Sequence, residues 1–427
     1  MEPAIMILLG SFFLLIFLNV PIAFAMGISS VLTSYYLDIQ LIMVFQRMIS
    51  GLRTFTFLAV PFFILVGLIM GNSGISEKII KFASLFIGRI KGGLAMVNVL
   101  ASMLFGGISG SSSADVSSIG ALLIPLMQEE GYDDDFSVAV TTTSSVQGVI
   151  IPPSQNIIYY SLAAGGLSVG RLFIAGYIPG ITLGIFLMAL CYILARKRDY
   201  PTGETIVLKE VPKVVFDSFL GLFTIIIIIG GIVAGVFTAT ESAAVAVVYV
   251  LFLSLFVYKS LTIKEIIKIF NQSIGTLSMI IAIISTSSAF AWLLAYLNIP
   301  QLLLNSLLGI TENRIILLLL INVILLFLGM IMDMGIIILL ITPILLPIVV
   351  QLGMNPIQFG IMMMLNLGIG LNTPPVGTSL YIGCAIAGIK IEETLKILVP
   401  FYIVMGAVLL LTIFWPEFTL YLPDLIF

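Results

Sequence analysis

The sequence predicts an all-α protein that crosses a membrane many times and contains two copies of one internal unit. The first observation behind this prediction is composition. Of the 427 residues, 60% are hydrophobic and 9% are charged, whereas roughly a quarter of the residues of an ordinary globular protein are charged. The second is a succession of apolar stretches of about 20 residues, the length that crosses a bilayer as a helix. The third is a repeated pattern of glycine and proline. Together they exclude a soluble enzyme.

Charge and residue counts exclude further classes of function. The 18 Lys and Arg residues and 21 Asp and Glu residues leave a net charge of −3, which provides no electrostatic basis for binding nucleic acid. The chain contains no histidine, the side chain that most often serves as general base, metal ligand or proton shuttle. Cys191 and Cys384 lie far apart in apolar runs, which is typical of packing residues and not of a disulfide or a metal site.

The apolar stretches predict eight membrane-spanning helices. They cover residues 4–27, 55–72, 172–195, 216–237, 241–258, 275–296, 314–332 and 400–416. The first stretch has no basic region before it and continues into further apolar sequence, so it predicts a retained span and not a cleaved signal peptide.

Basic residues predict the orientation of these spans. One cluster comprises Arg196, Lys197, Arg198, Lys209 and Lys213, and a second, two spans later, comprises Lys259, Lys264 and Lys268. Because two spans separate them, the clusters lie on one side of the membrane, which an excess of Lys and Arg marks as cytoplasmic. The polar stretch 196–215 predicts a cytoplasmic linker near the middle of the chain. Two amphipathic segments, 73–91 and 260–274, predict arm helices along the membrane surface, with ordinary polar connectors as the alternative.

An internal repeat relates residues 104–166 to residues 326–388 at a constant shift of 222. The glycine and proline identities pair Gly107 with Gly329, Pro125 with Pro347, Gly131 with Gly353, Gly148 with Gly370, Pro152 with Pro374, Pro153 with Pro375 and Gly166 with Gly388. Apolar positions match often by chance in such a chain, but aligned glycines and prolines do not. The pattern therefore predicts a duplicated unit.

Each copy predicts a hairpin followed by a broken helix. An apolar piece (93–108 or 314–330) runs into a short turn and returns through 116–127 or 336–350. The first return has about 12 residues, or about 18 Å of helix, which is too short to span and indicates a re-entrant hairpin. The adjacent prolines that follow end a helix and remove N–H donors. The carbonyls left free must be buried or line an aqueous cavity. Broken helices at corresponding places in two halves predict a secondary transporter.

The turns and breaks supply oxygen atoms that could bind Na⁺. The first turn, GGISGSSSAD, carries the hydroxyls of Ser109, Ser111, Ser112 and Ser113, and the first break carries the carbonyls of Gly148, Ile151 and Pro153. By the repeat, Gly370, Thr373 and Pro375 would face the turn 329–335. The alternative is that small residues serve close helix packing. The turn has no lysine and follows an apolar helix, so the phosphate-loop pattern fails. Coupling to an ion gradient is expected, not to ATP.

Carboxylates near the turns are also candidates, because intramembrane carboxylates are costly. Asp115 and Asp333 could balance a cation or cap a helix, while Glu241 is predicted to cap or to pack. No basic residue lies at a turn or break, so an anionic substrate would be held by helix N-termini and hydroxyls. The candidate substrate residues are Ser111, Asp115, Ser154, Asn156, Asn372, Thr378 and Ser379. The acidic run 129–135 predicts a solvated loop, with a docking surface as the alternative.

Five segments together resemble the large membrane subunit (DctM-like) of TRAP, or tripartite ATP-independent periplasmic, transporters. These segments are FQRMISGLRTFTFLAVPFFILVGLIM, GGISGSSSADVSSIG, GVIIPPSQNIIYYS, GVFTATESAAVAVVY and GLNTPPVGTSLYIG. The resemblance implies a Na⁺-coupled importer of organic anions in the bacterial inner membrane, without an organic cofactor. It implies a small four-helix membrane subunit and a periplasmic substrate-binding protein as partners. It also implies an elevator mechanism, in which a transport domain with two re-entrant hairpins slides against a scaffold within the lipid.

Carried over residue by residue, the resemblance places two sodium sites. The first comprises Ser109, Ser112, Gly148, Ile151 and Pro153, and the second comprises Gly329, Asp333, Gly370, Thr373 and Pro375. The second turn, GMIMDMG, has no serine, so this chain departs from the first site there. The chain starts directly with the first span of a large subunit, so the small subunit is expected to be a separate polypeptide. The expected substrate is a sialic acid, with C4-dicarboxylates as the other type.

The resulting domain organisation alternates scaffold and transport segments. It assigns 1–92 to N-terminal spans and the first arm helix, 93–170 to the first transport repeat, 171–258 to scaffold spans with the linker, 259–313 to the second arm helix and following spans, 314–392 to the second transport repeat and 393–427 to a C-terminal span. Two alternatives remain open. One is a stand-alone ion-coupled carrier of the two-hairpin class, and the other is a non-transporting membrane subunit of an enzyme complex.

Overall fold

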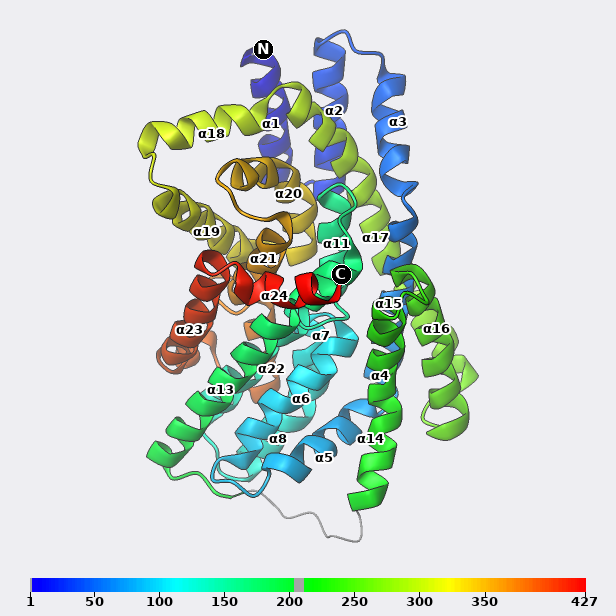
Figure 1. The fold of residues 1–427 in the computed structure, drawn as a ribbon, viewed down its shortest axis with the longest axis vertical. Helices are drawn as coiled ribbons and strands as arrows, with labels where there is room; N and C mark the ends of the chain where they lie inside the picture. The colour runs from blue at the N-terminus through cyan, green and yellow to red at the C-terminus, as the bar shows by residue number, and fades with distance from the viewer. Residues whose placement is uncertain (1, 203–210) are drawn as a thin grey trace.

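The fold is a bundle of helices, most of them apolar along their length (Figure 1). The structure, a computed structural model, describes residues 2–202 and 211–427. Within those residues the regular elements are helices, and one isolated β-bridge joins Lys91 to Thr202. Eight helices are long and apolar enough to cross a membrane. The predicted class, an all-α polytopic membrane protein, is therefore confirmed.

The N-terminal stretch departs from the prediction. Residues 4–27 do not form one span but belong to two helices, α1 (Glu2–Phe17) and α2 (Ile22–Tyr36), which lie side by side (Figure 1). The chain turns between them at Asn19, whose φ of 63° lies in the left-handed region, and Pro21 immediately precedes α2. Asparagine tolerates that region better than most residues, and proline favours the start of a helix. The uninterrupted apolar composition conceals this turn.

The second amphipathic segment is also different from the prediction. Residues 260–274 are not a separate arm helix, because α17 (Ile263–Tyr296) runs without a break through this segment and the span predicted at 275–296. A capping box between Thr262 and Glu265 fixes its start, and such a box satisfies two free backbone N–H groups. The first segment is a separate helix, α5 (Ile75–Ile87), and Gly74 before it has a φ of 69°. A helix does not continue through a left-handed residue, so the preceding helix, α4 (Ala59–Asn72), ends before α5 begins.

The other spans lie where the sequence predicts them, with shifted ends. They are Phe55–Asn72, made of η1 (Phe55–Leu58) and α4 (Ala59–Asn72); Val169–Arg198, made of α12 (Val169–Ala175) and α13 (Tyr177–Arg198); Val211–Val233, made of α14 (Val211–Ile225), η3 (Ile226–Gly230) and α15 (Gly231–Val233); Ala239–Val257, made of α16 (Ala239–Phe252) and η4 (Leu253–Val257); α19 (Arg314–Ile331); and α23 (Ile391–Phe414). The last begins nine residues before the predicted 400. The eighth apolar helix is α20 (Met334–Gln351). Shorter connecting helices are α3 (Leu41–Leu52), α18 (Ile299–Ile310) and α24 (Glu417–Ile426).

The predicted linker 196–215 is described at its two ends. Its first residues finish α13 and its last residues begin α14, whereas 203–210, including Lys209, lie outside the described residues. The two ends differ in their main neighbours: α13 packs against α6 (Gly93–Ser109) and α23, and α14 packs mainly against α5, with a smaller contact to α6. The predicted capping role of Glu241 is confirmed, since it forms a capping box with Thr238 at the start of α16. Both cysteines are buried free thiols.

The two segments compared by the repeat have the same order of helices. The first contains α6 (Gly93–Ser109), α7 (Ser112–Asp115), η2 (Val116–Gly120), α8 (Ala121–Glu129), α9 (Asp134–Ser144), α10 (Gln147–Ile150) and α11 (Gln155–Ala163). The second contains α19, α20, α21 (Pro356–Gly370) and α22 (Thr378–Ala387). Helix ends 222 residues apart correspond: Ser109 with Ile331, Ser112 with Met334, Glu129 with Gln351, and Asp134 with Pro356. The Pro152–Pro153 and Pro374–Pro375 bonds are both cis.

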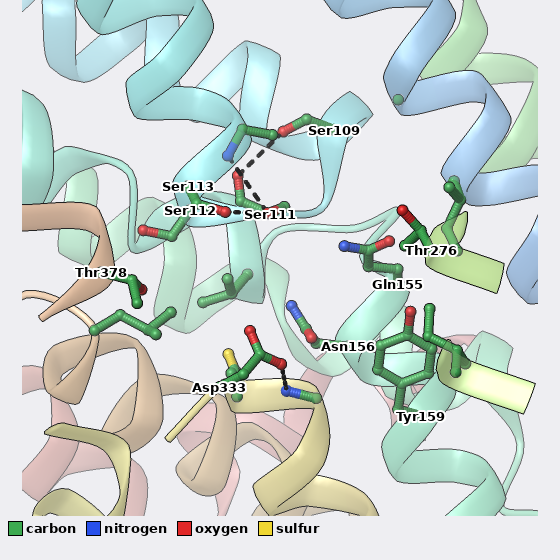
Figure 2. A pocket seen from close by; sticks show the side chains of 18 of the residues that line it. Ser109, Ser111, Ser112, Ser113, Gln155, Asn156, Tyr159, Thr276, Asp333 and Thr378 are labelled. Carbon is green, nitrogen blue, oxygen red and sulfur yellow. Dashed lines mark hydrogen bonds between the residues drawn. The ribbon is translucent and has the colours of Figure 1, made fainter. Parts of the chain in front are cut away.

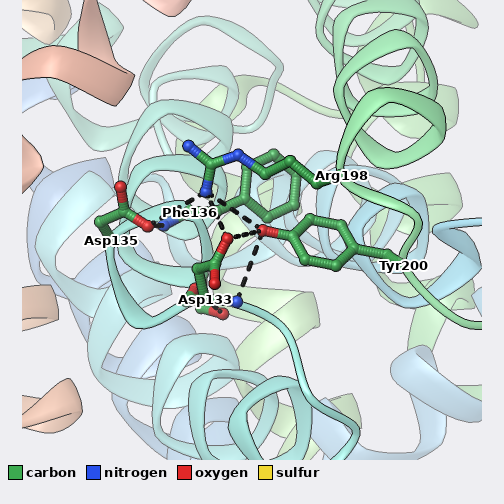
Figure 3. A network of polar contacts seen from close by, with 6 residues as sticks. Asp133, Asp135, Phe136, Arg198 and Tyr200 are labelled. Carbon is green, nitrogen blue, oxygen red and sulfur yellow. Dashed lines mark hydrogen bonds and ion pairs between the residues drawn. The ribbon is translucent and has the colours of Figure 1, made fainter.

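Part of the acidic run is paired and not simply solvated. Arg198, at the end of α13, forms ion pairs with Asp133 at 2.6 Å and Asp135 at 3.3 Å, and the Tyr200 hydroxyl donates to Asp133 at 2.6 Å (Figure 3). The Tyr200 hydrogen bond, together with the Arg198 charge, holds the pKa of Asp133 below its usual value. The Phe136 ring lies beneath the guanidinium of Arg198. The network joins the start of α9 to the end of α13. These two ends are distant in the sequence, so the sequence does not predict the contact between them.

Candidate functional site

A cavity of about 610 Å³ lies where the two hairpin turns approach α4 and α17. Its polar lining comes from the first turn, from the restart of the broken helix at α11, and from Asp333 and Thr378 in the second repeat (Figure 2). On the opposite side it is lined by Gly67 and Asn72 of α4 and by Thr276 of α17. Asp333 is its one acidic side chain, and no Lys or Arg lines it within the described residues.

The first hairpin turn lies directly against the first helix break. A Cβ built on Gly106 would come within 2.3 Å of the Gly148 Cα, and one built on Gly110 within 2.8 Å of the Gln155 amide nitrogen. Only glycine allows such a close approach between backbones. Asn156 donates from its side chain to the Gly110 carbonyl at 3.2 Å, which ties the restarted helix to the turn. The predicted first site is thus drawn together by backbone contact.

The serines of this turn make contacts across the two repeats. The Ser112 hydroxyl oxygen lies 2.6 Å from that of Ser145 and 2.8 Å from that of Ser379, and all three residues are buried. Ser111 caps α7 by accepting from the Ala114 N–H at 3.4 Å. Ser112 therefore occupies the centre of a hydroxyl cluster built by both repeats. Ser145, which the sequence interpretation did not single out, is part of that cluster.

The second turn and break meet in the same way. A Cβ on Gly370 would lie 2.7 Å from the Gly329 carbonyl carbon, and the Gly377 N–H donates to the Met330 carbonyl at 3.4 Å. Asp333 caps α20, its Oδ1 accepting from the Gly335 N–H at 2.9 Å. Asp333 was predicted either to balance a cation or to cap a helix, and in the structure it caps α20.

Residues around the second break are anchored to the backbone. The Thr373 hydroxyl donates to the Ile369 carbonyl at 2.7 Å, and the Asn372 side chain donates to the Gly368 carbonyl at 3.0 Å. The Tyr402 hydroxyl, on α23, donates to the Asn372 carbonyl at 2.6 Å. In the first break, Ser154 donates to the Val149 carbonyl at 2.9 Å. These bonds satisfy groups that the interrupted helices leave unpaired.

The predicted site residues divide into three groups by position. Those that line the cavity are Ser109, Ser111, Ser112, Asn156, Asp333 and Thr378. Asp115, Ser154, Asn372 and Ser379 are completely buried and do not line it, so they do not face the space a substrate would occupy. The remaining residues lie at the turns and breaks and do not line the cavity: Gly148, Ile151, Pro153, Gly329, Gly370, Thr373 and Pro375.

The cavity also contains residues that sequence reasoning missed. Gln155 and Tyr159 extend from α11 toward it, beside Thr276 (Figure 2). The position of Gln155 next to the first break was a usable signal. Nothing in the sequence near Asn72 or Thr276 indicates a role, because α4 and α17 reach the cavity only through tertiary packing.

A bundle of apolar helices whose two hairpin turns and two helix breaks enclose a polar cavity is the architecture of a membrane transporter, not of an enzyme. The structure resembles that of the YdaH transporter of Alcanivorax borkumensis, with a TM-score of 0.60 at 12% identity over 90% of this chain and 89% of that one. At that identity the likeness establishes the fold alone.

Sequence comparison establishes the family. The profile described as the DctM component of the tripartite ATP-independent periplasmic transporter matches residues 9–418. The sialic acid TRAP transporter large permease SiaM of Vibrio cholerae is 40% identical over 89% of both chains, and the C4-dicarboxylate TRAP transporter large permease DctM of Rhodobacter capsulatus is 35% identical over 99% of both. The chain belongs to the DctM family of TRAP transporter large permeases, which makes it a multi-pass protein of the bacterial inner membrane.

Proposed function

We propose that this large permease couples the import of an organic anion to the Na⁺ gradient. The observation that carries the proposal is the pair of turns and breaks beside a polar cavity without basic side chains. Unwound backbone carbonyls and hydroxyls are the ligands with which transporters of this architecture hold Na⁺. Since no Lys or Arg in the described lining balances an anion, bound Na⁺ would supply the positive charge.

The two proposed sodium sites are those of the two turns. The first uses Ser109, Ser112, Gly148, Ile151 and Pro153, and the second uses Gly329, Asp333, Gly370, Thr373 and Pro375. Close contact between Gly106 and Gly148, and between Gly329 and Gly370, supports both assignments. The 2.8 Å contact between Ser112 and Ser379 would connect the first site to the helix that restarts after the second break. The matching helix ends support the proposal that the sites arose with one duplicated unit.

The proposed substrate is of the sialic acid type, with C4-dicarboxylates as the alternative. The cavity offers hydroxyls and amides, including those of Ser113, Gln155 and Asn156, and its acidic side chain is unfavourable to a second carboxylate. Relatives are named for sialic acid, for C4-dicarboxylate and for 2,3-diketo-L-gulonate. A substrate with one carboxylate and many hydroxyls fits this lining better than a dicarboxylate.

Transport is proposed to proceed by an elevator movement. The moving unit would contain both repeats together with α13, because α13 packs along α6, α10 and α23. The scaffold would contain α1 to α4 and α14 to α17, so that the cavity lies between the two units. This assignment moves α13 out of the scaffold segment 171–258 of the initial domain prediction.

Two partners and the lipid complete the proposal. A small four-helix membrane subunit would join the scaffold, and a periplasmic substrate-binding protein would deliver the anion. The family description, a tripartite periplasmic transporter, supports both.

The deciding experiment is uptake into proteoliposomes that contain both membrane subunits and the binding protein. A panel of labelled sialic acids, sugar acids and C4-dicarboxylates is offered with an inward gradient of Na⁺ or of K⁺. We expect concentrative uptake of one class with Na⁺ and none with K⁺. Equal uptake in the two gradients would refute Na⁺ coupling. Undiminished uptake without the binding protein would favour the stand-alone carrier, and absence of uptake for every anion would favour a non-transporting subunit.

A further inference from the structure

A fully buried carboxylate lies behind the first turn and belongs to neither proposed sodium site. Asp115, at the end of α7, has an exposed fraction of 0%. Neither of its oxygens has a hydrogen bond of normal geometry in the part of the chain that the structure describes. It does not cap the helix that follows it. An unpaired carboxylate in such a place costs several kcal/mol, so its charge requires compensation.

No basic side chain provides that compensation. The helices α6, α8, α9, α10 and α22, which pack against α7 or η2, contain neither Lys nor Arg. The other neighbour, α5, carries two lysines. Lys78 faces Asp217 and the Tyr258 ring instead, and Lys81 is exposed. The positive charge opposite Asp115 therefore does not come from these helices.

The surroundings of Asp115 consist of neutral oxygen atoms. Ser102, on α6, approaches the carboxylate, and its hydroxyl lies 3.1 Å from that of Ser144 on α9. One turn before Ser102, Asn98 donates to the Thr141 hydroxyl at 2.6 Å, and its Oδ1 has no hydrogen-bond partner among the described residues. All these side chains are completely buried. Three helices thus bring a carboxylate, an amide oxygen and hydroxyls into one dry region.

The hairpin itself does not need these polar groups. The positions 222 residues further on, Ile337 for Asp115, Ile324 for Ser102 and Leu320 for Asn98, are apolar, and Ile337 is buried. Only Asn366, at the position of Ser144, is polar, and its side chain donates to Asn322 at 2.9 Å. The second segment nevertheless has the same order of helices. The carboxylate and the two polar side chains of α6 are therefore not required for this order of helices.

We propose that Asp115 binds a third sodium ion, held by its carboxylate together with the hydroxyls of Ser102 and Ser144. The inference rests on the proposed Na⁺ coupling and adds one ion to it. A single Na⁺ can coordinate several oxygen atoms at once, whereas a proton on Asp115 would form one hydrogen bond to one acceptor. Because α7 also carries Ser112 one turn earlier, occupancy of the deeper site would help to order the turn that forms the first sodium site.

The test compares thermal unfolding of the purified membrane complex in NaCl and in KCl. Asp115→Asn keeps the shape of the side chain and removes its charge. We expect this variant to be more stable than the wild type in KCl, because a buried charge is gone. Its stabilisation by NaCl should be smaller, and the Hill coefficient of the Na⁺ titration should fall by about one. The matched control is Asp134→Asn, which removes an exposed carboxylate at the start of α9 and should behave as the wild type.

A second variant guards against a folding defect in the first. Ser102→Ala removes one neutral ligand and should raise the Na⁺ concentration at half-maximal stabilisation by about tenfold or less, which corresponds to one lost hydrogen bond or ligand of at most about 1.4 kcal/mol. A wild-type Na⁺ titration in both variants overturns the proposal. So does a wild type that is stabilised by acid in KCl while Asp115→Asn is not, since that result assigns a proton. No Na⁺ stabilisation of the wild type would instead overturn Na⁺ coupling itself.

Discussion

At the scale of single residues, the proposed Na⁺ coupling depends on hydroxyls and backbone carbonyls. Ser112 illustrates why: its hydroxyl lies within 2.8 Å of two other hydroxyls from different segments, so its oxygen has a fixed position. A fixed neutral oxygen is a suitable ligand for a small cation and costs little to bury when it is hydrogen-bonded. The absence of histidine from the sequence agrees with coupling to Na⁺ and not with a proton relay.

Ser112→Ala should weaken Na⁺ dependence specifically. The substitution removes one ligand oxygen and very little volume, so expression and assembly should match the wild type. We expect the Na⁺ concentration for half-maximal uptake to rise by about tenfold, the loss of one good polar interaction of about 1.4 kcal/mol. Ser306→Ala, at an exposed position of α18, is the control. Unchanged Na⁺ dependence in Ser112→Ala would show that the first site is misplaced.

Asp133 should contribute to stability in a pH-dependent way. Its pKa is lowered by the Tyr200 hydrogen bond and the Arg198 charge, so the contribution is present above the ordinary pKa of about 3.9 and is lost as the pH falls through the lowered value. The pair is partly exposed, so Asp133→Asn should cost about 1 kcal/mol or less at pH 7. Thermal unfolding at pH 7 and at about pH 3.5 should show the difference from wild type shrinking in acid. Glu312→Gln, at an exposed position, is the control.

At the scale of elements, the hairpin turns and the breaks were predictable and the continuity of helices was not. Paired prolines and clustered glycines act on the backbone locally, so Pro152 and Gly106 indicate a break and a turn wherever they stand. The turn at Asn19 and the continuous α17 depend on weaker signals. An apolar run of 24 residues is compatible with one span or with two short helices, and an amphipathic segment is compatible with a surface helix or with the end of a long one.

Gly148→Ala should abolish transport by separating the turn from the break. The added methyl group would lie 2.9 Å from the Gly106 Cα, a backbone atom that cannot rotate away. We expect either misassembly or at least a tenfold loss of Na⁺-dependent uptake, measured with the amount of folded protein determined by size-exclusion chromatography. Gly406→Ala is the matched control, because a Cβ on that helical glycine meets nothing within 4 Å. Wild-type uptake in Gly148→Ala would contradict the contact between the turn and the break.

At the scale of the whole molecule, the cavity depends on two groups of helices that are distant in sequence. The turns supply the polar wall, and α4 and α17 supply the opposite wall. A cavity between two such groups is the place where movement of one group against the other would change access. The network of Asp133, Arg198 and Tyr200 (Figure 3) lies away from that boundary and braces α13 against α9.

A cross-link between the two groups should stop transport. A Cβ on Gly71 of α4 would lie 3.5 Å from the Ser118 hydroxyl of η2, so cysteines at these two positions would have their side chains next to each other. In a background with Cys191→Ala and Cys384→Ala, oxidation of the Gly71→Cys, Ser118→Cys variant should reduce uptake more than tenfold. A reducing agent should restore it, and each single variant should be insensitive to oxidation. Full cross-linking with undiminished uptake would contradict the elevator movement.

The sequence by itself determined the class of protein, the hairpins and the breaks. Its apolar composition requires a membrane environment, and glycine and proline determine the conformation of the backbone where they stand. It also indicated Ser109, Ser112 and Asp333 as residues near the functional cavity, all of which line it. Only the tertiary structure decided which groups meet: Asn72 and Thr276 on the far wall, Ser145 beside Ser112, and Asp115 buried behind the turn instead of facing the cavity. These contacts depend on how helices that are distant in the chain pack against each other. Packing between apolar faces has no local sequence pattern that would predict it.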